Sequence, residues 1–216
     1  MIRSFGVSEA LAILSGIQST VVLSLIAFIG GGLVGLAVAL MRTSDLAPLR
    51  RAAGLYIDFF QGTPLLMQLF LVFYGLPVFG LRVNAWVAVT IGLTLHASAF
   101  LGEIWRGGIQ AVPKGQTEAA IALGLGYTHR MIHVVVPQGA RLCMAPTVGF
   151  LVQLIKGTSL AAIIGFVELS RSAQIIASTT YKPLLAYGLA AIIYFILCFP
   201  LSRLSASFER RFAVKT

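Results

Sequence analysis

Two polar side chains, followed by a break-forming segment, lie in an otherwise apolar stretch of the chain, residues 142–167. Gln153 and Lys156 are close enough in sequence to share one face of a helix. Residues 157–159 are Gly, Thr and Ser, which predicts a helix break and a new N-cap. A helix N-terminus binds carboxylates through its partial positive charge, and a lysine ammonium would add to the attraction. The segment supplies four candidate ligand-pathway residues: Gln153, Lys156, Thr158 and Ser159.

Each polar candidate also has a structural interpretation. Lys156 can instead snorkel toward lipid headgroups or pair with a carboxylate of a neighbouring helix. Thr63-Pro64 predicts the start of a helix, with Thr63 as its cap and Pro64 as its first residue. Gln68 lies one turn later, and it either lines the pathway or hydrogen-bonds between helices. His96 lies near the middle of an apolar run and is either a pathway residue or a buried histidine bonded to a neighbouring carbonyl. Because polar groups are costly at membrane depth, Gln68 and His96 join the candidate pathway.

No arrangement of catalytic or metal-ligating residues accompanies these positions in the sequence. The chain has 3 histidines, and neither Gly-x-Ser-x-Gly nor His-Glu-x-x-His occurs. The phosphate-binding loop Gly-x-x-x-x-Gly-Lys-Ser/Thr does not occur either, so another polypeptide must hydrolyse any ATP that is used. Cys143 and Cys198 fall in apolar runs and are expected to be small packing residues. We therefore expect no catalytic residue, no metal site and no cofactor in this chain.

Composition places these residues in a membrane. The 216 residues are 58% hydrophobic and 11% charged, with a mean hydropathy of +0.92, which leaves too little polar surface for a soluble globule. A helix needs about 20 apolar residues to cross the hydrocarbon core. Gly31 and Gly35 have the spacing of small residues that lets two such helices pack closely. The apolar runs predict one all-α transmembrane domain over residues 1–216 with five transmembrane helices, near 17–41, 63–80, 84–105, 142–167 and 184–203.

The net charge of +9 is unevenly distributed over the predicted topology. A few cations fall on one side of the membrane: Arg3, Arg82, Arg171 and Lys182. Most fall on the other side: Arg42, Arg50, Arg51, Arg106, Lys114, Arg130, Arg141, Arg203, Arg210, Arg211 and Lys215. Because lysine and arginine are enriched in cytosolic loops, we expect an external N-terminus, a cytosolic C-terminus and contact with membrane lipid. This distribution argues against nucleic acid as a partner.

The longest polar interruption, residues 107–141, is expected in the cytosol. Residues 113–117 supply turn and helix-start chemistry, Glu118 suits a helix N-terminus, and Gly124 is expected to end the helix. A second helical stretch is predicted over 128–137, ending at the proline. The alternative is an ordinary amphipathic connection lying on the membrane surface. The first helix is interpreted as a docking element with four candidate coupling residues: Glu118, Ala119, Ala120 and Gly124.

Several motifs in the chain follow a known pattern. The interruption contains Glu118-Ala119-Ala120, then Gly124, then Val136-Pro137-Gln138. Outside it stand Gly62-Thr63-Pro64-Leu65-Leu66, Glu103-Ile104-Trp105-Arg106-Gly107-Gly108-Ile109 and Lys156-Gly157-Thr158-Ser159-Leu160. In residue type and spacing these motifs resemble the permease subunits of binding-protein-dependent ABC importers, in the branch that imports polar amino acids.

The resemblance implies a type I ABC importer permease fold in the bacterial inner membrane. It implies that the interruption holds a coupling helix, the EAA loop, seated in a groove of an ATP-binding subunit that binds ATP and Mg. A second permease subunit, identical or similar, and an extracytoplasmic amino-acid-binding protein are the further expected partners. The function implied is import of an amino acid, powered by ATP hydrolysis in the partner.

Two departures from the family pattern concern the cargo. Gln61 stands where many relatives have arginine, and Gly157 stands where many have aspartate. A missing acid near the pathway argues against a cationic amino acid as cargo. The competing interpretation of the whole chain is an ion-coupled secondary transporter or channel, which needs coupling-ion sites and usually internal inverted repeats; neither is clear in this sequence.

Overall fold

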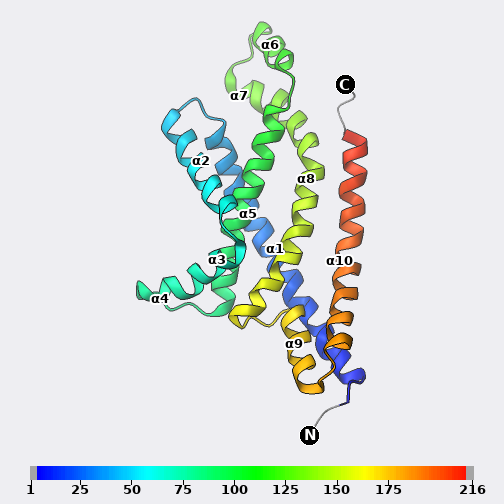
Figure 1. Cartoon of the computed structure of the whole chain (residues 1–216). Coiled ribbons are helices and arrows are strands. Elements are labelled where there is room, and N and C mark those ends of the chain that lie inside the picture. The colour runs from blue at the N-terminus through cyan, green and yellow to red at the C-terminus, as the bar shows by residue number, and fades with distance from the viewer. Residues whose placement is uncertain (1–3, 213–216) are drawn as a thin grey trace.

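The computed structural model describes residues 4–212, and its secondary structure over that range is entirely helical (Figure 1). Four stretches are long and apolar enough to cross a membrane: α1 (Val7–Arg42), α5 (Ala85–Gln110), the stretch Tyr127–Ile164 and α10 (Pro183–Phe212). A fifth span exists if α2 (Ala47–Gly62) and the bent stretch Leu65–Val78 are counted as one. This all-α membrane fold confirms the predicted class. Arg3 and Lys215, used in the charge argument, lie outside the described residues.

Shorter elements connect the long helices. They are α3 (Leu65–Phe70), the π-helix η1 (Leu71–Gly75), α4 (Leu76–Val78), α6 (Lys114–Ala122), α7 (Tyr127–Arg130), the π-helix η2 (Met131–Val135), α8 (Val136–Gly157), the 3₁₀-helix η3 (Thr158–Ile164) and α9 (Leu169–Thr180). α6 lies at one end of the bundle with the last turns of α10, and α9 lies at the opposite end with the start of α1 (Figure 1). We call these the α6 end and the α9 end.

The crossing of α1 and α5 is built on glycines. A Cβ added at Gly31 would lie 2.5 Å from the Ala97 Cβ, and one added at Gly35 would lie 2.8 Å from the Ser98 carbonyl oxygen. Any side chain at either position would push the two backbones apart. The close packing predicted from the glycine spacing is therefore confirmed, and it allows α1 and α5 to form the core of the bundle.

The chain turns sharply between α2 and α3, where the two stretches are bent by 105°. Thr63 has an extended backbone (φ −114°, ψ 143°) because it precedes a proline, and its hydroxyl donates to the Phe59 carbonyl at 2.8 Å. Pro64 is the N-cap of α3, so the first helical residue is Leu65, one later than predicted. The predicted span near 63–80 is not a crossing helix by itself, because Leu65–Val78 is long and apolar enough only when it is counted together with α2. The break directs α3 and α4 away from α2 (Figure 1).

The stretch Tyr127–Ile164 is continuous, so the predicted helix end at Pro137 is wrong. The π-helix η2 precedes α8, and the Val136 N–H donates to the Met131 carbonyl across its widened turn. Pro137 then falls in the first turn of α8, where its missing N–H is tolerated. The helix therefore runs from the polar interruption directly into the membrane.

The predicted N-cap after Gly157 is also wrong. The Thr158 hydroxyl donates to the Ile155 carbonyl and the Ser159 hydroxyl to the Lys156 carbonyl, both at 2.7 Å. These bonds run back toward the preceding turn and lead into the 3₁₀-helix η3, so neither hydroxyl caps a new helix. The next helix, α9, begins only at Leu169.

The N-cap of α9 is Glu168, a fully buried carboxylate. Its Oε1 accepts from the Arg171 backbone N–H at 2.8 Å, and its Oε2 accepts from the Tyr194 hydroxyl of α10 at 2.8 Å. Thr20 of α1 adds a longer contact to the carboxylate and accepts from the Leu169 N–H at 3.2 Å. Helices α1, α9 and α10 are thus joined by one polar network at the α9 end.

Candidate functional site

The polar interruption forms a short helix, α6, that projects from the α6 end. The Leu125 N–H donates to the Ala120 carbonyl at 3.0 Å and the Gly124 N–H to the Ile121 carbonyl at 2.9 Å, a Schellman arrangement. Gly124 has φ +75°, which a residue with a side chain rarely adopts. Its predicted role as the end of the helix is confirmed. Glu118, however, lies beyond the first turn, because α6 already begins at Lys114.

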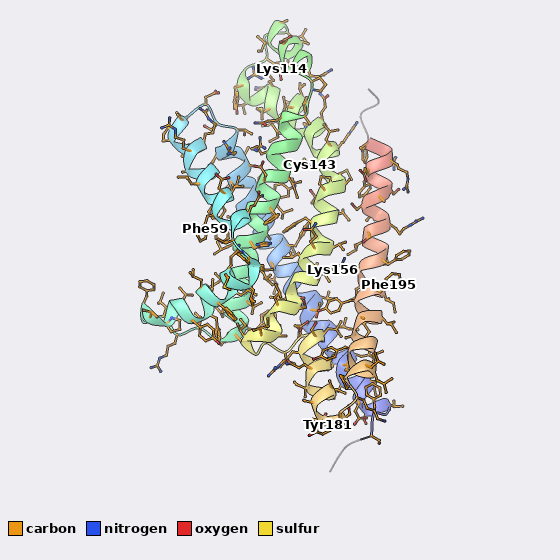
Figure 2. The ribbon with its side chains drawn as sticks, viewed as in Figure 1. Phe59, Lys114, Cys143, Lys156, Tyr181 and Phe195 are labelled. Carbon is orange, nitrogen blue, oxygen red and sulfur yellow. The ribbon has the colours of Figure 1, made fainter. Side chains whose placement is uncertain are left out.

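The exposed face of α6 combines one carboxylate with apolar side chains. Glu118 and Ala119 are exposed, as are the neighbouring Ile121 and Leu123. Ala120 is only 3% exposed, so it faces the rest of the chain. Figure 2 shows Lys114 at the tip of the molecule, where α6 begins. The exposed side of the helix is therefore the Glu118–Ala119 side, with Ala120 beneath it.

A hydrogen bond links α6 to the long helix that follows. The Gln138 Nε2 of α8 donates to the Gln116 Oε1 of α6 at 3.2 Å and to the Val134 carbonyl at 2.9 Å. α6 also packs on η2. α6 is thereby joined to η2 and to the start of α8.

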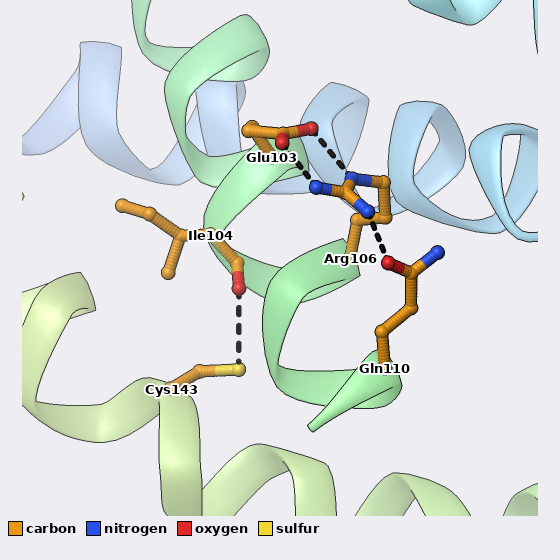
Figure 3. Close-up of polar contacts among 5 residues, drawn as sticks. All are labelled: Glu103, Ile104, Arg106, Gln110 and Cys143. Atoms are coloured by element: carbon orange, nitrogen blue, oxygen red, sulfur yellow. Dashed lines mark hydrogen bonds and ion pairs between the residues drawn. The ribbon is translucent and has the colours of Figure 1, made fainter. Parts of the chain in front are cut away.

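Below α6, helices α5 and α8 meet backbone to backbone. A Cβ added at Gly108 would lie 2.8 Å from the Gly139 carbonyl oxygen and 1.9 Å from the Cys143 Sγ. The Cys143 thiol is near the Ile104 carbonyl, at 3.5 Å (Figure 3). It donates to the Gly139 carbonyl at 3.0 Å. Cys143 and Cys198 are both buried free thiols, as expected of packing residues. We call the contact of Gly108 with Gly139 and Cys143 the α5–α8 crossing.

An ionic cluster on α5 lies beside this crossing. Arg106 pairs with Glu103 and also donates to the Gln110 side chain (Figure 3). The Arg106 Nε to Glu103 Oε2 distance is 2.7 Å. All three side chains belong to one helix and satisfy one another, so the cluster stiffens the end of α5.

Two of the predicted pathway residues lie in contact. The Gln68 Oε1 is 3.0 Å from the His96 Nδ1. The Gln68 Nε2 faces three oxygens, the carbonyls of Phe60 and Thr63 at 2.7 and 3.0 Å and the Thr63 hydroxyl at 2.9 Å. Because the amide nitrogen is occupied as a donor, the amide oxygen accepts from an Nδ1–H of His96. Gln68 thus closes the α2–α3 break, and the partner of His96 is this side chain rather than a backbone carbonyl.

His96 continues into a stack of aromatic rings from α5 and α8. Its ring centroid is 4.5 Å from that of Phe100, and Phe100 lies 5.3 Å from Phe150 in a stacked arrangement. Both phenylalanines line a cavity of about 640 Å³ between α5, α8 and α10. Gly149 and the predicted pathway residue Gln153 line the same cavity. The cavity is large enough for a small polar solute.

The other predicted pathway residues lie apart from this cavity wall. Lys156 is exposed on α8, close enough to Cys198 of α10 for an electrostatic interaction; Figure 2 labels it near the middle of the bundle. Thr158 is fully buried and Ser159 is half-buried, and both hydroxyls are bonded within their own turn. The structure brings Gln68 and His96 together and places Gln153 on the cavity, but it does not gather all six residues at one point.

Sequence reasoning missed several residues of the site. Arg141, Ser205 and Glu209 line the outer part of the cavity, and the Ser205 hydroxyl donates to the Ala145 carbonyl at 2.8 Å. The pairing of Gly108 with Gly139 was also missed, because it joins two helices that are far apart in sequence. The signal available in the sequence was that each of these glycines lies within a few residues of a predicted helix end.

The comparison with known proteins defines the class of the chain. Residues 31–214 match the family described as binding-protein-dependent transport system inner membrane component. The chain belongs to this family, whose members are the multi-pass inner-membrane permease subunits of ABC importers. The EAA loop and its coupling helix are features of this family.

Particular relatives are similar over most of their length. The probable amino-acid ABC transporter permease protein YckA of Bacillus subtilis (strain 168) is 39% identical over 86% of this chain and 82% of its own. The L-cystine transport system permease protein TcyB of the same organism is 39% identical over 91% and 84%. A crystal structure of an amino acid ABC transporter with histidines is 38% identical, covers 95% of this chain and 96% of its own, and has a TM-score of 0.89. An inward-facing MetNI methionine ABC transporter, 20% identical over 94% of each chain with a TM-score of 0.63, shares the fold.

Proposed function

We propose that this chain is the permease through which an amino acid is imported, powered by ATP hydrolysis in a separate ATP-binding subunit. The similar proteins described as amino-acid and L-cystine permeases support the class of cargo. The observation that carries the coupling is α6, a helix with an exposed face of Glu118, Ala119 and Ile121 at one extremity of the molecule. In this proposal one permease domain carries the coupling segment over residues 107–141.

The α6 end faces the cytosol in this proposal, and the N-terminus lies outside. Helices α6 and α10 carry Lys114, Arg203, Arg210 and Arg211 at that end, whereas α9 at the other end carries Arg171. Cytosolic enrichment of cations supports this orientation. An extracytoplasmic binding protein then delivers the amino acid at the α9 end, and the ATP-binding subunit, with its ATP and Mg, docks on α6.

Coupling follows the contacts along the chain. Movement of α6 is transmitted through the Gln116–Gln138 bond to α8, and through the α5–α8 crossing to α5. Because both helices line the cavity, their displacement changes the space around Phe100, Phe150 and Gln153. A second permease, identical or similar, completes the wall of the pathway. Alternating access results when this movement opens one end and closes the other.

The amino acid meets few polar groups on this route. The cavity offers the Gln153 amide, the Arg141 guanidinium, the Ser205 hydroxyl and the Glu209 carboxylate. His96 lies behind Phe100 with its Nδ1–H engaged by Gln68. Gln68 and His96 therefore shape the wall, whereas Gln153 contacts the cargo directly. Lys156, Thr158 and Ser159 complete the pathway set, with Lys156 presented on the exposed face of α8.

Substitutions on α6 test the proposal. Ala119→Arg places a bulky charge on the exposed face, and Gly124→Val forces a side chain into φ +75°. Loss of an interface hot spot weakens docking by about 2 kcal/mol or more, roughly thirtyfold. We expect both variants to lose ATP-dependent amino acid uptake in native membrane vesicles and to lose the co-purifying ATP-binding subunit. Gly126→Ala is the matched control, because a Cβ at Gly126 meets nothing within 4 Å and its φ of −64° is ordinary.

The competing function makes the opposite prediction. An ion-coupled transporter or channel would carry the amino acid in vesicles that lack the ATP-binding subunit, driven by an ion gradient alone. Uptake under those conditions, or unchanged uptake in the Ala119→Arg and Gly124→Val variants, contradicts our proposal.

A further inference from the structure

A separate polar pocket lies between the end of α1 and the start of α2. Its volume is about 350 Å³, and three arginines dominate its lining, which consists of Arg42, Arg50, Arg51, Gly54, Leu55 and Asp58. Arg42 is the last residue of the α1 span, so the pocket lies where that span reaches the membrane surface. None of its residues belongs to α6 or lines the cavity between α5, α8 and α10. The coupling mechanism therefore leaves this pocket without a role.

Within residues 4–212, the ion pair with charged atoms within 4.0 Å is Glu103–Arg106, which lies outside the pocket. The pocket arginines therefore have no paired carboxylate in that range. The Arg50 Nη1 donates to the Ser44 carbonyl at 3.1 Å. The Arg42 guanidinium lies against Gly54, where an added Cβ would be 3.5 Å from its Cζ. Asp58 is the one carboxylate in the lining. Three guanidinium groups facing one carboxylate leave an excess of positive charge for an anionic ligand.

The chemistry of the lining favours a phosphate group. The planar guanidinium presents paired N–H donors that match two phosphate oxygens, and it is less strongly hydrated than an ammonium. Basic pockets between transmembrane helices on the cytoplasmic side bind phospholipid headgroups in other membrane proteins. Free phosphate offers the same oxygens, so the surroundings of the pocket must distinguish the two sources.

Apolar side chains beside the arginines favour a lipid. Leu55, which lines the pocket, is 72% exposed, and Phe59, one turn further along α2, is 53% exposed. Figure 2 shows Phe59 on the outer side of α2, away from the bundle. Arg51, Leu55 and Phe59 follow one another at four-residue spacing, so a single face of α2 passes from charged to apolar. A phospholipid fits such a face, because its headgroup binds the charged part and its acyl chain lies along the apolar part.

We propose that this pocket binds the phosphate of an anionic phospholipid, held by Arg42 and Arg51, with the acyl chain along Leu55 and Phe59. The site belongs to the cytosolic leaflet, a placement that rests on the orientation in the proposed function. Lipid bound there joins the end of α1 to the start of α2. Because α1 packs on α5 through Gly31 and Gly35, the lipid composition of the membrane then affects the packing of the permease core.

Lipid retention by the purified transporter tests the site without requiring transport. The intact complex is reconstituted into mixed vesicles of phosphatidylglycerol and phosphatidylcholine, extracted gently, and its bound lipid is counted by native mass spectrometry. We expect preferential retention of phosphatidylglycerol by the wild type, and a loss of roughly fivefold per arginine, about twenty-fivefold in all, in Arg42→Gln/Arg51→Gln. The matched control is Arg203→Gln, an exposed arginine on α10 outside the pocket. It should retain lipid like the wild type.

A charge-conserving variant and two competitors complete the test. Arg42→Lys/Arg51→Lys keeps the charge and should fall between the wild type and the glutamine variant, because it loses the paired donors. Unchanged phosphatidylglycerol retention in the glutamine variant overturns the proposal. Displacement of the lipid by inorganic phosphate assigns the pocket to free phosphate and also overturns it. Loss of the ATP-binding subunit with unchanged lipid retention assigns the arginines to that protein instead.

Discussion

The contact between Gln68 and His96 shows how one side chain serves two structural needs. Gln68 donates to carbonyls released by the α2–α3 break and accepts from a histidine on α5. In a membrane interior an unsatisfied carbonyl is costly, so an amide at this position stabilises a bend that lipid alone would not tolerate. His96 is in turn held in one orientation against Phe100.

We expect the two residues to be energetically coupled. His96→Phe keeps an aromatic ring beside Phe100 but leaves the Gln68 Oε1 without its donor, at a cost of about 1–3 kcal/mol. Gln68→Leu removes the same hydrogen bond and the contacts to the break. A double-mutant cycle on the unfolding of the purified protein in detergent should therefore give an interaction energy of about 0.5–3 kcal/mol.

Additive effects would contradict this coupling. If the double variant loses the sum of the two single losses to within about 0.5 kcal/mol, the pair does not act as a unit. His133→Phe provides the histidine control, because that side chain is exposed and its ring lies against that of His129. It should leave the unfolding free energy nearly unchanged.

At the residue level, the sequence showed where polar side chains carry a physical cost, while their role in a pathway stays a prediction. Gln68 and His96 attract attention because polar groups are rare in apolar runs, and the structure joins them. Thr158 and Ser159 were misread because a hydroxyl after a glycine can cap a new helix or bond back to the preceding turn. That choice depends on η3 and Glu168, which the sequence of the segment does not reveal.

Among the elements, α5 and α8 approach each other backbone to backbone. Gly108 and Gly139 face each other so closely that no Cβ fits at Gly108. In the proposed coupling, this crossing passes movement from α8 to α5. We therefore expect a methyl group added at Gly108 to disturb both packing and coupling.

Adjacent glycines offer a matched comparison at this crossing. Gly108→Ala introduces a Cβ 2.8 Å from the Gly139 carbonyl oxygen and should destabilise the protein by about 1–3 kcal/mol and lower ATP-dependent uptake. Gly107→Ala meets nothing within 4 Å and should be neutral or stabilising by up to about 1 kcal/mol. Thermal unfolding in detergent and uptake in vesicles measure both effects. Equal behaviour of the two variants would contradict the role given to the crossing.

Helices could be predicted from the sequence where the signal lay within the helix itself. The long spans α1, α5 and α10 could be predicted because about 20 apolar residues suffice to specify a crossing. The bend at Pro64 and the continuity through Pro137 could not, since both are proline sites with opposite outcomes. A π-helical turn accommodates Pro137, whereas Gln68 stabilises the break beside Pro64. Those partners lie outside the local pattern.

On the scale of the whole molecule, the two ends differ in character. The α6 end carries the short exposed helix α6 and the arginine pocket, and the α9 end carries the buried Glu168 network. The segregation of cations along the sequence predicts which end faces the cytosol. This prediction rests on summed charge rather than on any single contact, and the orientation stays a prediction.

Thiol labelling tests the orientation directly. Lys114 begins α6 and Tyr181 follows α9, at opposite ends of the bundle (Figure 2). With a membrane-impermeant maleimide, Tyr181→Cys should be labelled in intact cells, and Lys114→Cys only after the membrane is opened. The native Cys143 and Cys198 are buried and provide the unlabelled background. The reverse pattern would place α6 outside and contradict ATP-driven coupling from the cytosol.

The uninterrupted stretch Tyr127–Ile164 has a mechanical consequence. With a rise of about 1.5 Å per residue, and about 2.0 Å for the 7 residues of η3, its 38 residues extend about 60 Å along the helix. If it pivots where Gly139 touches Gly108, the arm toward α6 is about 18 Å long and the arm through η3 about 41 Å. The helix is then a lever with its fulcrum off centre, and a push on the short arm is roughly doubled at the far face of the membrane.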